Sequence, residues 1–200
     1  MKTNNIKNFI NENILINKKV LNDDEFVNKI YEFYKICLKC ILSGGKILAC
    51  GNGGSAADAS HFVTELMGRF NQDRNPYPAV SLNSNTVLLT ALANDCEYCK
   101  VFSRQVFALM QPKDVLVAIS TSGLSSNILN AIKSAKQIGG KTVILTSELF
   151  KKENYAFDLM LDVPSKNTPR IQECHTLILH IVCELMEKEL YEMQFVNKKS

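Results

Sequence analysis

The sequence predicts an α/β protein of three layers, an α/β/α sandwich around a mainly parallel sheet. Segments with strand patterns alternate with segments of helical periodicity along the whole chain. The central strands, such as 115–119, are uniformly apolar, which is typical of parallel strands covered by helices on both faces. With 200 residues, 46% of them hydrophobic, and no Pro- or Ser-rich linker, the chain predicts a single domain over residues 1–200.

The elements follow one another in a regular order. The first clear helix is expected from about Asn22 to Leu42, because Asn22 or Asp23 is a suitable N-cap and Gly44-Gly45 a suitable end. Strands are expected at 46–50, 78–82, 115–119, 142–146 and 159–163. Helices are expected after the glycine-rich segment 51–55, near 86–93, at about 97–110, after the serine-rich segment 120–123, and from about 169 to 193.

Composition argues against several classes of protein. The net charge of +3 comes from 23 basic and 20 acidic residues that are interspersed, which is unlike a nucleic-acid-binding surface. The N-terminus lacks the apolar core of a signal peptide, and no apolar run reaches the length of a membrane span. We therefore expect a cytoplasmic protein with neither a nucleic acid nor a membrane as its partner.

The seven cysteines form an odd set, so a disulfide framework is not expected. Two Cys-x-x-Cys pairs raise a zinc hypothesis. Cys37 and Cys40 fall within an amphipathic helical pattern, which favours packing. Cys96 and Cys99 lie beside an expected loop, but one pair lacks the second set of ligands that a structural zinc site needs. Neither pair predicts the function.

A glycine-rich segment, Cys50-Gly-Asn-Gly-Gly-Ser55, joins the strand 46–50 to the next helix. The backbone N–H groups of such a turn, at the positive end of a helix dipole, bind phosphate or another oxyanion. The segment lacks the Gly-x-Gly-x-x-Gly order and no Walker lysine follows it, which argues against dinucleotide and nucleoside triphosphate sites. A monophosphorylated sugar is the better hypothesis.

Hydroxyl side chains gather after the apolar strand 115–119, at Ser120, Thr121, Ser122 and Ser125. One hydroxyl would be enough to cap the helix that follows, so four of them favour phosphate binding over capping alone. In open parallel sheets, ligands bind outside the carboxyl ends of the strands. We therefore expect this loop and the glycine turn to face one pocket.

His61 and Glu65 lie one helical turn apart after the glycine turn, and Arg69 is expected a further turn along the same face. A lone histidine is more often a packing or surface residue, but a polar stripe beside an anion site favours a functional role. The last helix adds polar residues to an otherwise apolar pattern, namely Arg170, Gln172, Glu173, His175 and His180. Taken alone, His180 is also compatible with packing.

Together these motifs resemble those of the phosphoheptose isomerases, bacterial members of the sugar isomerase (SIS) domain family, over nearly the whole chain. The motifs are Cys50-Gly-Asn-Gly-Gly-Ser55, His61-Phe with Glu65 and Gly68-Arg69, Asn94-Asp95, Ser120-Thr-Ser-Gly123, and Arg170-Ile-Gln-Glu173 with His175 and His180. The resemblance implies a Rossmann-like SIS fold. It also implies interconversion of sedoheptulose 7-phosphate and D-glycero-D-manno-heptose 7-phosphate, the first step toward heptose units of lipopolysaccharide core or capsule.

The resemblance further implies the roles of individual residues. The substrate's phosphate is expected among Ser120, Thr121, Ser122 and Ser125. Other substrate contacts are expected from Asn52, Gly53, Gly54, Ser55, Glu65, Arg69, Asn94, Asp95 and Gln172. The acid/base pair is expected to be Glu65 and His180. One zinc ion per subunit is expected on His61, Glu65, Gln172 and His180, a mixed set of nitrogen and oxygen ligands that zinc accepts.

These roles leave alternatives open. A carboxylate suits the proton that moves between C1 and C2, and an imidazole suits the protons on their oxygens, which assigns Glu65 as the base. A glutamate bound tightly to zinc is a poorer base, however, and zinc either polarises the substrate carbonyl or orders the site. Pro169 stands where some relatives carry an acidic residue, so no third acid is expected there.

The spacing of the last helix suggests an oligomer. Gln172 and His180 are separated by about 12 Å of helical rise, which is far for ligands of one zinc ion. We therefore expect these residues to meet a site from different subunits, at an interface of the oligomer. A homotetramer is expected, in which the N-terminal helical segment, about residues 1–43, packs in the oligomer.

Other functions share this fold. A non-enzymatic SIS adaptor that binds the bacterial replication initiator resembles the chain at Leu82-Asn83 and 89–95, but such adaptors lack the residues that correspond to Glu65 and His180. A second alternative is an isomerase of another sugar phosphate. A sensor domain that binds a sugar phosphate without turnover is a third, and the 200 residues show no appended DNA-binding or regulatory module that would favour it.

Overall fold

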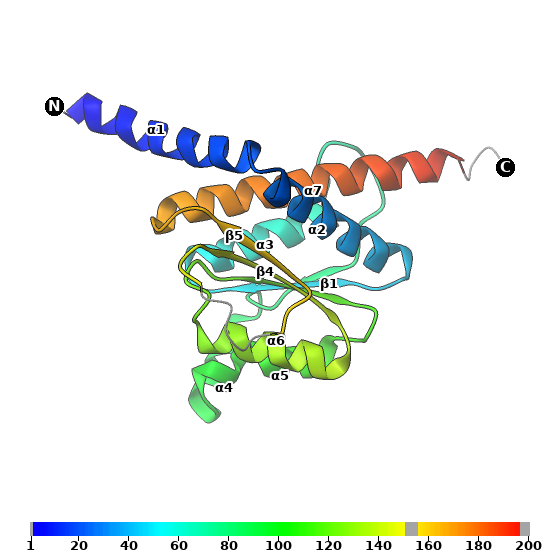
Figure 1. The fold of residues 1–200 in the computed structure, drawn as a ribbon. Helices are drawn as coiled ribbons and strands as arrows, with labels where there is room; N and C mark the ends of the chain where they lie inside the picture. The colour runs from blue at the N-terminus through cyan, green and yellow to red at the C-terminus, as the bar shows by residue number, and fades with distance from the viewer. Residues whose placement is uncertain (1, 151–155, 197–200) are drawn as a thin grey trace.

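A parallel sheet lies between two layers of helices in the computed structural model, which describes residues 2–150 and 156–196 (Figure 1). Its strands are β1 (Ile47–Gly51), β2 (Ala79–Ser81), β3 (Val115–Ile119), β4 (Lys141–Ser147) and β5 (Leu159–Val163). They are arranged in the order β2-β1-β3-β4-β5, and each neighbouring pair is parallel. The predicted α/β/α sandwich is confirmed, and the sheet that was expected to be mainly parallel is parallel throughout its described strands.

Helices cover both faces of the sheet. One face carries α2 (Asp24–Leu42), α3 (Gly54–Met67) and α7 (Thr168–Val196), and the other carries α5 (Val101–Leu109) and α6 (Ser126–Ile138) (Figure 1). Next to α5 and α6 lie α4 (Thr86–Asp95) and the 3₁₀ helix η1 (Tyr98–Lys100). The N-terminal α1 (Lys2–Leu21) packs on α7 and extends beyond the rest of the molecule (Figure 1). Throughout the described part of the chain, no helix is both long and apolar enough to cross a lipid bilayer.

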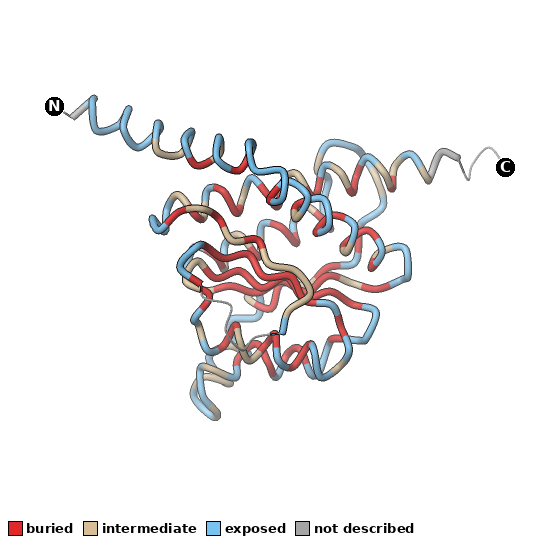
Figure 2. Tube along the Cα trace, viewed as in Figure 1, coloured by how far each residue is buried: buried red, intermediate tan, exposed pale blue. Residues whose placement is uncertain are grey.

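Alternate residues of the strands build two separate cores. Ile47 and Ala49 of β1 join the core under α2, α3 and α7, whereas Leu48 and Cys50 join the core under α5 and α6. The central strands are buried along their whole length (Figure 2). Burial on both faces explains why these strands are apolar at every position rather than at every second one.

Local capping explains where several elements begin and end. Of the two candidates for the N-cap of α2, Asp23 takes the role, since its side chain accepts a hydrogen bond from the N–H of Phe26 at 3.0 Å. Helix α6 ends at Gly139, whose φ of 87° is in the left-handed region that favours glycine. The single helix expected at 97–110 is wrong in its first turn, because η1 precedes α5 there.

Two cysteines of α2 confirm the packing interpretation. Cys37 is 0% exposed and Cys40 is 3% exposed, and both belong to the core between α2 and the sheet. Burial raises the pKa of Cys40 to about 11. A thiol that is buried and protonated in this way acts as a small apolar side chain.

A buried histidine makes the stability of the fold depend on pH. His175 is 0% exposed, and its Nε2 donates a hydrogen bond to the carbonyl oxygen of Thr146 at 2.8 Å. Burial lowers the pKa of His175 to about 4, although the hydrogen bond to Thr146 opposes this shift. The unfolded chain, with a histidine pKa of about 6.5, therefore binds the proton first as the pH falls.

We expect the free energy of unfolding to be highest above pH 6.5 and to fall by about 3 kcal/mol between pH 6.5 and pH 4 because of this group. The measurement is urea denaturation at a series of pH values. The variant His175→Gln, which keeps a donor for Thr146 but does not titrate, should show a flatter profile across that window. An equal slope in both proteins would contradict the assignment.

Candidate active site

The glycine turn brings the backbone close to α7. Gly53, just before α3, has a φ of 56°, which a residue with a side chain rarely adopts, and the space beside it is open. At Gly54 a Cβ would lie 2.5 Å from Nε2 of Gln172. A side chain at position 54 would therefore displace the amide of Gln172 from the first turn of α3.

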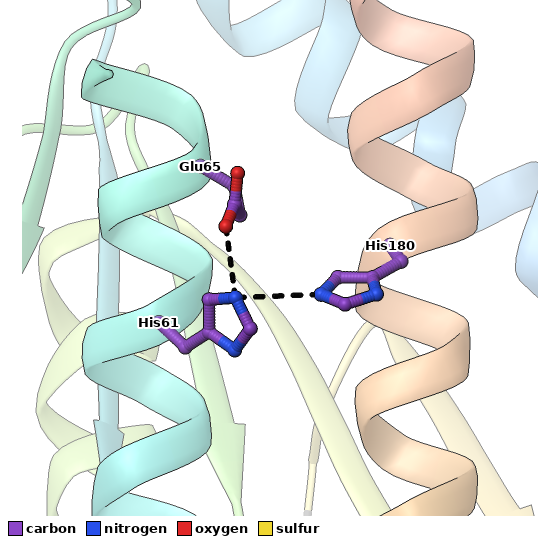
Figure 3. Close-up of side chains that lie close together, drawn as sticks. All are labelled: His61, Glu65 and His180. Carbon is purple, nitrogen blue, oxygen red and sulfur yellow. Dashed lines mark hydrogen bonds and ion pairs between the residues drawn. The ribbon is translucent and has the colours of Figure 1, made fainter. Parts of the chain in front are cut away.

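Three side chains that the sequence assigned to metal binding or proton transfer converge between α3 and α7 (Figure 3). Nε2 of His61 lies 2.8 Å from Oε1 of Glu65 and 3.5 Å from Nε2 of His180. The two imidazole rings meet edge to face, with centroids 4.9 Å apart. Within residues 2–150 and 156–196, this is the one group of three or more His, Cys, Asp or Glu side chains whose ligand atoms lie close enough to hold a metal ion. Neither Cys-x-x-Cys pair belongs to it.

The cluster is open on one side and covered on another. The side chain of His61 is 45% exposed and that of Glu65 is 20% exposed. The ring of Phe70 lies 5.9 Å from that of His180 and covers it in part. A small polar molecule can therefore reach the carboxylate and the imidazoles directly from solvent.

Different subunits were expected to contribute the four predicted zinc ligands, His61, Glu65, Gln172 and His180. For His61, Glu65 and His180 this expectation is wrong. Helices α3 and α7 run side by side, so residues that are distant along α7 face successive turns of α3. Gln172 lies against Gly54, the hydroxyl of Thr176 donates to Oδ1 of Asp58 at 2.9 Å, and His180 reaches His61. His61, Glu65 and His180 thus meet within one chain, whereas Gln172 lies at the other end of the seam between the two helices.

Between these ends, Asp58 adds a carboxyl group that the sequence did not single out. Burial raises the pKa of Asp58, although the hydrogen bond from Thr176 and the nearby His61 oppose this shift. Its Oδ2 is buried, with no hydrogen-bond partner among the atoms that the structure describes. The seam between α3 and α7 therefore carries polar groups along its whole length.

Arg69 does not continue the polar face of α3. The helix ends at Met67 with Gly68 as its C-cap, so Arg69 lies exposed beyond it. The expectation of a further turn along the same face was wrong because it assumed that the helix runs through Gly68.

An arginine that sequence reasoning missed fixes the end of α3 instead. Nη2 of Arg74 donates to the carbonyl oxygen of Glu65 at 2.8 Å, and Nη1 donates to that of Leu66 at 3.0 Å. Nε of Arg74 donates to Oε1 of Glu187 on α7 at 3.0 Å, and both side chains are almost fully buried. In the sequence, Glu187 stands out as a charged residue within the apolar pattern of α7. Nothing in the sequence, however, indicates that its partner is Arg74.

The serine-rich loop takes its predicted place after β3. Ser125 stands at the N-cap position of α6, yet its side chain makes no capping hydrogen bond. Ser120 is buried, and its hydroxyl accepts from the N–H of Gly123 at 3.1 Å. The hydroxyl of Ser122 accepts from the N–H of Leu124 at 3.2 Å, and the neighbouring Thr121 is half-buried. The hydroxyl of Ser125 thus does not cap α6, and it lies 3.5 Å from the hydroxyl of Ser120.

The other predicted substrate contacts lie at the glycine turn and at the end of α4. Ser55 is 3% exposed and its N–H donates to the carbonyl of Asn52, so it belongs to the turn itself. Asn94 and Asp95 are exposed at the end of α4, where the amide of Asn94 donates to the carboxylate of Asp95 at 2.8 Å. The side chain of Asn52 lies against Asn127 of α6.

Comparison with known proteins places the chain in a family. Residues 11–147 match the model of the SIS domain. A phosphoheptose isomerase of Aliarcobacter butzleri is 45% identical over 95% of this chain and 99% of its own length. One from Clostridium acetobutylicum is 44% identical over 93% and 97% of the two chains. The chain belongs to the phosphoheptose isomerase family.

Solved structures agree with this membership. The phosphoheptose isomerase of Neisseria gonorrhoeae matches with a TM-score of 0.87 and 37% identity, over 94% of this chain and all of that one. The structure from Francisella tularensis matches with a TM-score of 0.89 and 34% identity, over 94% and 99%. The resemblance inferred from the motifs is confirmed, and the SIS fold of this phosphoheptose isomerase family member includes both the glycine turn and the serine-rich loop.

Proposed function

We propose that this protein is an aldose–ketose isomerase that interconverts sedoheptulose 7-phosphate and D-glycero-D-manno-heptose 7-phosphate, and so supplies heptose for lipopolysaccharide core or capsule. The observation that carries the proposal is the convergence of Glu65, His61 and His180 between α7 and the helix that follows the glycine turn. Relatives named phosphoheptose isomerase, at 45% and 44% identity over nearly the whole chain, support the substrate.

The side chains suit an enediol mechanism. Starting from the ketose, the carboxylate of Glu65 takes a proton from C1, and the electron pair forms the C1–C2 double bond of the enediol. The same carboxylic acid returns the proton to C2. Meanwhile His180 removes the proton from the C1 oxygen and gives one to the C2 oxygen, so that the carbonyl moves from C2 to C1. No atom is gained or lost.

The donor set at this position fits zinc. It offers two imidazole nitrogens and a carboxylate oxygen, all within 4.8 Å of one another. The 3.5 Å between Nε2 of His61 and Nε2 of His180 is close to the spacing of about 3.3 Å between two ligands of a tetrahedral zinc ion. We propose these residues as ligands, and Gln172 stays a predicted fourth.

When bound, zinc supplies a Lewis acid that polarises the substrate's carbonyl or hydroxyl oxygens. Glu65 can both bind the metal and transfer a proton, because it has two carboxylate oxygens. Its Oε1 faces His61, while its second oxygen points away from both imidazoles (Figure 3). That second oxygen is the one we assign to proton transfer.

The phosphate of the substrate is proposed to bind at the loop 120–125, where the N-terminus of α6 and its dipole favour an anion. The hydroxyls of Thr121, Ser122 and Ser125 are the expected donors. The hydroxyl of Ser120 instead holds the loop, because it accepts a hydrogen bond from the N–H of Gly123. The sugar is proposed to lie across the glycine turn toward Glu65. The other proposed contacts are Asn52, Gly53, Gly54, Ser55, Arg69, Asn94, Asp95 and Gln172.

The direct test is turnover. We expect purified protein to convert sedoheptulose 7-phosphate to the aldose, and zinc removal by a chelator to lower the rate, with recovery when zinc is added back. The non-enzymatic adaptor predicts no turnover with any sugar phosphate. An isomerase of another substrate predicts turnover with a shorter ketose phosphate but not with the heptulose.

The N-terminal helix supports the proposal of an oligomer. Exposed apolar side chains follow one face of α1, namely Ile6, Phe9, Ile10 and Ile14, each 42–59% exposed. A helix that extends from the molecule with such a face is typical of a protein–protein interface. We propose that α1 packs against other copies of the chain in a homotetramer, and that sites lie near the interfaces.

We expect the double variant Ile6→Glu with Ile10→Glu to sediment as a smaller species than the parent protein in analytical ultracentrifugation, because two charges enter the apolar face. Asn4→Glu with Asn8→Glu is the matched control, since it adds the same charge to the opposite face of α1. Equal sedimentation of both double variants would contradict an interface at this face.

A further inference from the structure

The glycine turn is held from two sides by asparagine side chains. On the β2 side, the amide of Asn83 donates to the carbonyl of Gly51 at 2.9 Å and accepts from its N–H at 3.1 Å. On the β3 side, Asn52 and Asn127 form a reciprocal pair, in which each amide donates to the other's oxygen at 2.9 and 2.8 Å. The turn is therefore anchored to both neighbours of β1 in the sheet.

The pair between Asn52 and Asn127 joins the two loops that the function needs. Asn52 belongs to the glycine turn, whereas Asn127 lies in the first turn of α6, directly after the loop 120–125. Asn127 is 2% exposed, so its amide and carbonyl are shielded from water. A buried pair of amide hydrogen bonds holds its geometry because breaking it leaves polar groups without partners.

The side chain of Asn52 has little capacity left for a sugar. Its oxygen accepts from Asn127 at 2.8 Å and also from the hydroxyl of Tyr98 at 3.2 Å, which uses both lone pairs of the oxygen. One N–H of its amide donates to Asn127. The position of Asn52 is thus set by protein groups before any ligand binds.

We propose that Asn127 is a positioning residue that fixes, through Asn52, the distance between the glycine turn and the phosphate-binding loop. This role rests on the isomerase function proposed above. It explains how one substrate can be held at its phosphate while its other end is presented to Glu65. A displacement of about 1 Å between the two loops is enough to cost about 100-fold in rate.

The test compares the binding of two probes, sedoheptulose 7-phosphate and inorganic phosphate, by calorimetry. For Asn127→Leu, whose side chain is similar in size, uncharged and unable to donate to Asn52, we expect affinity for the sugar phosphate to fall at least tenfold. Affinity for inorganic phosphate should change less than twofold, because the loop 120–125 is untouched. Asn130→Ala is the matched control, since Asn130 lies one turn along α6 and donates to the carbonyl of Cys99 rather than to Asn52. It should keep both affinities.

A second measurement does not depend on any sugar. If the two asparagines form one unit, the shift in urea midpoint of Asn52→Ala with Asn127→Ala should be smaller than the sum of the two single shifts, because each single variant already breaks the pair. Midpoint shifts that add, or an equal loss of affinity for both probes in Asn127→Leu, would overturn the positioning role. If the parent protein binds the heptulose phosphate but does not convert it, the proposed reaction is refuted. The binding and stability results for Asn127 would still test its positioning role.

Discussion

Glu65→Gln is expected to lower kcat for the isomerisation by a factor of about 100 to 10,000, the range that general acid–base catalysis contributes. The amide has nearly the same shape as the carboxylate but cannot accept the proton from C1. The fold should be unaffected, because Arg74 binds the backbone carbonyl of residue 65 and not its side chain. The measurement is steady-state kinetics, with circular dichroism to verify folding.

Zinc content separates the two roles of Glu65. If the side chain acts only as a ligand, the variant should lose zinc and regain activity at high zinc concentration. If it is also the base, the rate should stay low with the metal site filled. Thr64→Ala, a change at an exposed position next to it on α3, is the control and should keep parent activity. Parent-like kcat in Glu65→Gln would exclude it as the base.

Glu187→Gln is expected to lower the free energy of unfolding by about 3–5 kcal/mol, the usual cost of removing one partner of a buried ion pair. The carboxylate of Glu187 accepts from Arg74 and from the N–H groups of Asn71 and Gln72, at 2.9–3.2 Å. In either orientation, the NH₂ group of a glutamine here would face one of these N–H groups, and two donors cannot bond to each other. The guanidinium of Arg74 would also lose its counter-charge.

Urea denaturation at a fixed protein concentration measures this effect. The exposed pair of Glu97 and Lys100 provides a control, because Glu97→Gln removes an ion pair that is already solvated and should leave the midpoint where it is. Activity should fall along with stability in Glu187→Gln, since Arg74 also binds the backbone of Glu65. A midpoint equal to that of the parent would contradict the role given to this pair.

The sequence predicted the layers of the fold because the central strands are buried on both faces. Val115–Ile119 is apolar at every residue, which is typical of a strand that helices cover on both faces. The end of α3 was harder to predict. A helix that stops at Gly68 and one that runs through it to Arg69 carry the same local pattern, and only the contacts of Arg74 with α7 decide between them.

The site was predictable where its residues share one element, and less so where two helices meet. His61 and Glu65 are one turn apart in the sequence, so their proximity follows from helical geometry. The approach of His180 depends on how α7 lies along α3, and the local sequence does not encode this. Measured along α7 alone, the distance between Gln172 and His180 suggested different subunits. Because α3 and α7 lie side by side, His180 reaches His61 within one chain, and no second subunit is needed to supply it.

The placement of Glu65, His61 and His180 on two helices, away from the loop 120–125, has a consequence for how such enzymes can diversify. The helices that carry these side chains pack on one face of the sheet, whereas the serine-rich loop leads into α6 on the other face. Under the proposed function, substitutions in that loop would alter which phosphorylated chain is accepted without moving Glu65, His61 or His180. With these proposed roles, selection would act on substrate length and on reaction chemistry as two separate traits.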